Sequence, residues 1–160
     1  MKRLILIIAV FVLMVLGFGI QNAHAYEKGY NGNVSISENI GINKGLINNV
    51  VEITTSHGYN FGDGMYMGGG IGLNFGLNGS FAGVPMFYEM KYNIVDWKIS
   101  PYLDCRVGTT IGAEHDNPAF LVSPGLGFDY RKISFRAGYK CEAGGYVKLH
   151  SVALSIAFNF

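Results

Sequence analysis

The last ten residues of the chain, SVALSIAFNF at positions 151–160, alternate strictly between two kinds of side chain. Even positions carry valine, leucine, isoleucine and two phenylalanines, whereas odd positions carry serine, alanine or asparagine. Successive side chains of a β-strand point to opposite faces, so this pattern predicts a strand with one bulky apolar face and one small or polar face. A soluble barrel needs its bulky side chains inside, whereas a membrane barrel turns them toward lipid and keeps a polar interior. The small, polar second face therefore favours a membrane barrel.

The same division recurs at positions 84–94, 99–111 and 133–141. Segments at 30–42, 51–59, 65–75 and 120–128 follow it less cleanly. Glu38 falls on the lipid side of the first of these, which predicts a bulge there or a position near the headgroups. Pro124 falls inside the last, where it cannot donate to a strand ladder.

Turn-like stretches separate these segments into eight strands. They lie at 43–49, 60–64, 76–81, 95–98, 112–118, 130–132 and 142–145. The predicted fold is all-β: an eight-stranded antiparallel up-and-down transmembrane β-barrel. An even strand count puts both ends of the barrel chain on the periplasmic side, so the connection at 112–118 faces outward. Side chains fill the interior of an eight-stranded barrel, so we expect no open pore.

The N-terminus predicts an export signal in place of a barrel strand. Lys2 and Arg3 precede an apolar run at 4–20, and the small-residue site AHA follows at 23–25. This order is typical of a signal peptide, here cleaved after Ala25, and leaves a barrel domain at 26–160. A retained transmembrane helix is the alternative, because the run approaches the ~20 residues that span a bilayer. The cleavage site and the polar residues directly after it favour the signal peptide.

Composition excludes some functions and suits a barrel. The full chain has 12 basic and 11 acidic residues, and removal of the predicted signal peptide takes away Lys2 and Arg3. The mature chain is then almost neutral, so its charge suggests no nucleic-acid partner. The chain holds 23 glycines, 10 tyrosines and 11 phenylalanines. Small residues inside a barrel and large ones outside would account for the abundance of glycine and of aromatic residues. Outer-membrane lipid is the partner that this pattern implies.

Several short motifs resemble a known family. They are TTSHGY at 54–59, MGGGIGLN at 67–74, ISPY at 99–102, SPGLG at 123–127 and the terminal Phe160. Together they resemble the outer membrane protein β-barrel domain family, whose architecture is that of the small OmpA/OmpX-like barrels. The resemblance covers the mature chain and implies a Gram-negative outer-membrane location and no catalytic residues. It also implies that the barrel-assembly machinery recognises the terminal alternation, which comprises Val152, Leu154, Ile156, Phe158 and Phe160.

Eight charged residues are predicted to point inward. They are Glu52, Glu89, Lys91, Asp104, Arg106, Asp129, Arg136 and Lys140. One interpretation is a polar path or binding site inside the barrel. The other is a network of ion pairs that fills a dry lumen. Four acids face four bases, and a lone buried charge is costly, so the second interpretation is favoured.

No residue pattern predicts catalysis, a cofactor or a metal site. Cys105 and Cys141 fall on strands separated by a third, about 10 Å apart and beyond the ~7 Å Cα limit for a disulfide. His57 points away from Ser56 by parity, and His150 likewise diverges from the serine that follows it, so neither can activate that hydroxyl. His115 lies in a loop between two acidic residues without a recognisable metal spacing.

Aromatic residues gather near the predicted periplasmic strand ends. They are Tyr59, Phe61, Tyr92, Trp97 and Tyr130. Such residues form girdles at membrane interfaces. The sequence thus predicts a structural or surface-interaction protein of the outer membrane, and leaves its surface partner undefined. Two alternatives stay open: a lipid-modifying enzyme of that membrane, and a soluble periplasmic barrel that binds an apolar ligand.

Overall fold

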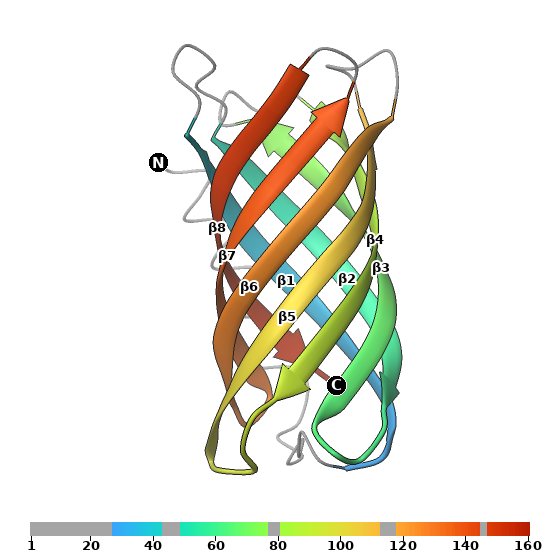
Figure 1. The fold of residues 1–160 in the computed structure, drawn as a ribbon, viewed down its shortest axis with the longest axis vertical. Helices are drawn as coiled ribbons and strands as arrows, with labels where there is room; N and C mark the ends of the chain where they lie inside the picture. The colour runs from blue at the N-terminus through green and yellow to red at the C-terminus, as the bar shows by residue number, and fades with distance from the viewer. Residues whose placement is uncertain (1–26, 43–48, 77–80, 113–117, 145–146) are drawn as a thin grey trace.

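The computed structural model describes residues 27–42, 49–76, 81–112, 118–144 and 147–160. The predicted signal peptide, His115 and most of the connections expected to face outward lie outside these ranges. Eight strands make up the fold (Figure 1). They are β1 (Gly29–Gly41), β2 (Val50–Asn60), β3 (Met65–Gly76), β4 (Phe81–Asn93), β5 (Ile99–Ile111), β6 (Ala119–Tyr130), β7 (Ile133–Gly144) and β8 (Val147–Asn159).

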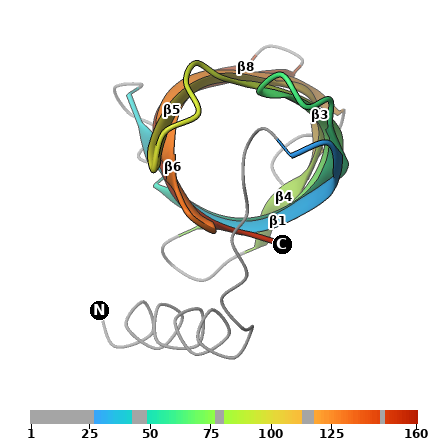
Figure 2. The ribbon, with the colours of Figure 1, turned by 90° about the horizontal axis from the view of Figure 1, so that it is seen from below.

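Each strand pairs antiparallel with the next, and β8 pairs back onto β1. The sheet is therefore a closed ring when viewed along its axis (Figure 2). This confirms the predicted eight-stranded antiparallel barrel. Of the described residues, none belongs to a helix long and apolar enough to cross a membrane.

The strand parity read from the sequence agrees with the observed burial. Along β1 the buried residues Ser35, Ser37 and Asn39 alternate with Ile36, Glu38 and Ile40, which are less buried. Large apolar side chains cover the outside, and Tyr88 is the most exposed of them at 79%. The distribution is inverted relative to a soluble protein, whose apolar side chains gather in the core.

The strand irregularities lie elsewhere than expected. The bulge that we considered at Glu38 is absent, because Glu38 pairs with Val51 and Leu154 within unbroken registers. The register shifts instead between β3 and β4, at Asn74 and Phe75. Gly83 lies beside this shift with a φ of 154°, in a region that side chains rarely adopt.

Pro124 interrupts a ladder without changing its register. It lies on the exposed face of β6 and opposite Cys105 of β5. On its other side, pairing with β7 stops after Val122 and resumes at Gly125 in the same register. The missing N–H of proline therefore leaves a local gap in the pairing but does not shift the strand.

Gly108 provides a test of how tightly the interior is packed. A Cβ added there would meet the Met86 backbone oxygen at 2.0 Å and the Phe87 Cα at 2.6 Å. At the outward-facing Gly69 the nearest atom would be 3.8 Å away. We expect Gly108→Ala to lower the free energy of unfolding by about 1–3 kcal/mol through overpacking. Urea unfolding of the refolded barrel in detergent micelles measures this. Gly69→Ala is the matched control, and equal effects of the two variants would contradict the packing argument.

Candidate functional site

The interior of the barrel holds a large group of charged side chains. All eight predicted inward charges are partly or fully buried, and Lys91 is the least buried of them. Each acid is paired with one base, within 2.6–2.9 Å between nitrogen and oxygen. The structure thus brings these residues together in three tiers along the barrel axis.

The lower tier lies near the end that carries the β2–β3, β4–β5 and β6–β7 turns. Lys91 of β4 binds Asp129 of β6 at 2.7 Å, and its ammonium group lies 4.2 Å from the centre of the Tyr102 ring. Asp129 also accepts hydrogen bonds from Asn93 and Ser134. Its carboxylate therefore has several donors in addition to one cation.

The middle tier contains two arginine–carboxylate pairs. Arg106 and Glu89 are direct cross-strand partners in β5 and β4, and they are 2.9 Å apart. Arg136 of β7 reaches past β6 to Asp104 of β5 at 2.7 Å. Gly125 of β6 makes this reach possible, because a Cβ there would lie 2.5 Å from Asp104 Oδ1 and 2.7 Å from Arg136 Nε.

The upper tier joins strands that do not touch. Lys140 of β7 binds Glu52 of β2 at 2.6 Å, although β8 and β1 lie between their strands. Lys140 also binds Glu142, 3.2 Å away, and Thr110 donates to the Glu142 carboxylate. The inward position of Glu142 was not predicted, because residues 142–145 were expected to form a turn. Residues two apart on a strand point to the same face, so its spacing from Lys140 already indicated an inward side chain.

Some buried polar atoms have no partner within the protein. They are both polar side-chain atoms of Asn39, the Oδ1 atoms of Asn33, Asn74 and Asp104, and the Oε2 of Glu89. Buried polar groups of this kind are ordinarily satisfied by a protein group or by ordered water. Because these atoms are spread along the barrel, the lumen suits ordered water between its side chains better than a fully dry filling.

The histidines and cysteines lie on the other face of the sheet. His57 hydrogen-bonds to Tyr30 at 2.5 Å and to Thr55 at 2.9 Å, whereas Ser56 points inward and bonds to Tyr66. His150 bonds to and stacks on Tyr139. The predicted divergence of His57 and Ser56 is confirmed. Each described histidine thus has a tyrosine partner, and among the described residues no serine hydrogen-bonds to His57.

Cys105 and Cys141 are free thiols on β5 and β7, with β6 between these strands. Both are partly exposed on the outer face. Within the described part of the chain, no group of three or more His, Cys, Asp or Glu residues could hold a metal ion.

The residues of the expected assembly signal lie on the outer face of β8 and just beyond it. Val152, Leu154 and Phe160 are 40–49% exposed, whereas Phe158 is only 8% exposed. Phe160 exchanges two backbone hydrogen bonds with Gly32, which extends the β1–β8 pairing. Its ring packs edge-on against His57.

The predicted aromatic residues lie at the same end of the barrel as Phe160. Trp97 is 73% exposed in the β4–β5 turn, and Tyr59 packs against Phe61 at a ring distance of 5.5 Å. Tyr92 and Tyr130 lie exposed at the ends of β4 and β6. Together they place a ring of aromatic side chains around the end that carries the described turns.

Closed strand pairing, an apolar exterior and a charged interior define the chain as a small eight-stranded barrel of the membrane type. Its fold is similar to the N-terminal β-barrel domain of Pseudomonas aeruginosa OprF, with a TM-score of 0.52 and 14% identity. It is equally similar to the Yersinia pestis outer membrane protein Ail, solved in a phospholipid bilayer nanodisc, with a TM-score of 0.52 and 13% identity. Both matches cover 84% of this chain and 100% of the other. No family model matches the sequence, and no curated protein does. The expected small OmpA/OmpX-like architecture is thus confirmed at the level of fold.

The Asp104–Arg136 pair gives a test of the interior network. Replacing Arg136 with methionine leaves the buried Asp104 carboxylate without its cation, and we expect a loss of about 3–5 kcal/mol in unfolding free energy. The double variant Asp104→Leu/Arg136→Met should lose less than the sum of the single variants, because no charge is stranded. Urea unfolding followed by the fluorescence of Trp97, the single tryptophan, measures both. Lys98→Met, at an exposed position, is the control. Additive losses would show that the pair is not coupled.

Proposed function

We propose that this chain is an integral protein of a bacterial outer membrane, exported by a signal peptide cleaved after Ala25. Its role is structural or one of surface interaction, without an open pore. The observation that carries the proposal is the inverted side-chain distribution. Exposed Met90, Leu103 and Leu126 contrast with buried Glu89, Asp104 and Arg106 on the same strands or neighbouring ones. Lipid on the outside accounts for both sets, whereas water would not.

The proposed orientation places the aromatic end of the barrel toward the periplasm. Trp97, Tyr92 and Tyr130 then lie at the inner headgroup region, where amphipathic rings are favoured. The ends at which β1, β3, β5 and β7 finish then face the outside of the cell. Any recognition of a partner would use the connections that follow these strands, and their short sequences argue against a large binding interface.

The side chains that occupy the lumen support a closed interior. Three ion-pair tiers and the buried Tyr66, Phe87 and Tyr102 share the narrow lumen. A soluble barrel that binds an apolar ligand would need an apolar cavity in their place. A lipid-modifying enzyme would need a nucleophile activated by His57 or His150. The described partners of these histidines are tyrosines and Thr55, and the Thr55 hydroxyl donates its proton to the Asn33 backbone oxygen at 3.0 Å and not to His57.

Membrane location is tested by fractionation and heat-modifiability. We expect the protein in the carbonate-resistant outer-membrane fraction, beginning at Tyr26, with different gel mobilities before and after boiling. A tag inserted at Asn117 should be labelled on intact cells. Soluble protein with a single mobility would refute the membrane barrel. A membrane barrel whose tag is labelled only after lysis would refute the orientation alone.

The closed lumen is tested by conductance in planar lipid bilayers. We expect purified refolded barrel to give no steady ohmic channels, because paired charges and aromatic rings fill an interior of this strand number. A porin from the same preparation procedure serves as the positive control. Reproducible open channels from the wild-type barrel would contradict the structural interpretation of the interior.

A further inference from the structure

Three cations gather on one side of the aromatic end of the barrel. Lys98 is the last residue of the β4–β5 turn, and Arg131 and Lys132 form the two-residue β6–β7 turn. The ends of β5 and β6 are paired, so these two turns lie next to each other. The β2–β3 turn at the same end holds Asp63 and no basic residue. Among the described turns, positive charge is therefore concentrated over β5, β6 and β7.

Two of these cations share one aromatic ring. The Lys98 Nζ lies 6.0 Å and the Arg131 Cζ lies 5.6 Å from the centre of the Tyr130 ring. Within the described part of the chain, neither of them nor Lys132 forms an ion pair with a carboxylate. This holds although Asp96 lies in the same turn as Lys98. Like charges that lie this close repel each other, and an anion bound between them would relieve the repulsion.

The backbone of Arg131 gives a second, independent indication of a binding role. Its φ is 55°, and it is the one residue other than glycine with a positive φ in the described part of the chain. The first position of a two-residue hairpin turn requires this conformation, which glycine and asparagine adopt more readily than arginine. Arginine therefore brings strain to the turn without improving it. Strained residues of this kind are typical of functional sites.

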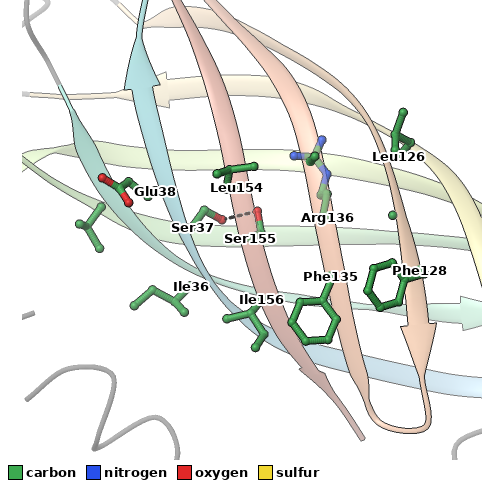
Figure 3. Close-up of a pocket in the computed structure, with 13 residues that line it drawn as sticks. Ile36, Ser37, Glu38, Leu126, Phe128, Phe135, Arg136, Leu154, Ser155 and Ile156 are labelled. Carbon is green, nitrogen blue, oxygen red and sulfur yellow. Dashed lines mark hydrogen bonds between the residues drawn. The ribbon is translucent and has the colours of Figure 1, made fainter. Parts of the chain in front are cut away.

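Apolar rings continue from Tyr130 toward the middle of the barrel. Phe128 precedes Tyr130 by two residues on β6, and its ring stacks on Phe135 of β7 at 5.0 Å. Both phenylalanines line one end of a shallow hollow of about 560 Å³ on the outer face over β6, β7, β8 and β1 (Figure 3). In the proposed orientation, the cations lie at the level of the inner-leaflet headgroups and these rings at the level of the acyl chains.

We propose that Lys98, Arg131 and Lys132 bind the phosphate of one phospholipid with a net negative charge in the inner leaflet. Its acyl chains lie against Phe128 and Phe135. A zwitterionic lipid binds more weakly there, because its own ammonium group offsets the charge of its phosphate. Clusters of basic residues beside membrane-spanning segments recognise anionic headgroups in this way. The proposal rests on the proposed membrane location and orientation.

Quenching of Trp97 fluorescence by brominated lipid tests the proposal. Trp97 is the single tryptophan and directly precedes Lys98, so it reports on lipid at this site. The mature barrel is refolded into phosphatidylcholine vesicles that contain a minor fraction of either brominated phosphatidylglycerol or brominated phosphatidylethanolamine. We expect phosphatidylglycerol to be enriched at Trp97 about eightfold over phosphatidylethanolamine, which is about twofold for each of three exposed cations.

Substitutions test whether the three cations form the site. Lys98→Gln and Arg131→Asn should each lower the enrichment about twofold, and adding Lys132→Gln to both should abolish it. Lys148→Gln, at an exposed position at the opposite end of the barrel, is the matched control and should leave it intact. Arg131→Asn should also keep or raise the urea midpoint, because asparagine tolerates the left-handed backbone. A lower midpoint with unchanged enrichment would assign the arginine to the turn alone and contradict the proposal.

Equal quenching by the two brominated lipids in the wild type, or an enrichment that survives the triple variant, would overturn the proposal. An equal loss in Lys148→Gln would do the same, because it would show attraction by the total charge of the barrel. Both leaflets of the vesicles have the same composition, so the result does not depend on the direction of insertion. Heat-modifiability of each variant shows that the barrel is intact. Failure here is thus distinct from failure of the membrane location or of the orientation.

Discussion

Pairing of the last strand with the first is the interaction on which the rest of the structure depends. β8 meets β1 from Gly41 and Ser151 to Asn33 and Asn159, and two bonds between Phe160 and Gly32 extend the seam. In a hydrocarbon environment there is no water to satisfy a free strand edge, so every unpaired N–H and C=O would cost several kcal/mol, to order of magnitude. A sheet with these apolar outer side chains is therefore compatible with lipid only as a closed ring.

Closure leaves a narrow interior, which explains the many glycines. Large inward side chains lie over glycines of the neighbouring strand. A Cβ on Gly127 would meet the Tyr102 ring at 2.6 Å, and one on Gly70 would meet the Phe87 ring at 2.5 Å. Gly125 makes room for Arg136 and Asp104 in the same way. Large inward side chains on one strand thus face glycines on the next, and this arrangement fills the polar interior. It also brings the charged groups close enough to form ion pairs.

Sequence alone predicted the strand count and the face that most strand residues occupy, because alternation along a strand and turn-like stretches are both local features. It could not place the bulge at Asn74 and Phe75, which arises from how β3 and β4 fit together. The pairing of Lys140 with Glu52 could not be predicted either, because it depends on the stagger of two strands that are not neighbours. Glu142 was missed where a glycine-rich stretch reads as a turn although β7 continues to Gly144. The hollow on the outer face over β6, β7, β8 and β1 depends on the strand registers, which place the small Ala137 between Leu126 and Leu154.

The Lys140–Glu52 pair of the upper tier also forms only when the ring of strands closes. Lys140 and Glu52 are separated by 88 positions in the sequence and meet only when β7, β8, β1 and β2 lie side by side. A partly formed sheet would present Glu52 without its counter-ion, whereas Lys140 would keep Glu142 of its own strand as a partner. Such a sheet gains little from entering hydrocarbon before the ring is complete, because a single unpaired charge there is expensive. The pairing of Glu52 with Lys140 therefore favours transfer into hydrocarbon together with closure of the ring, because only the closed ring brings β2 and β7 into reach of each other.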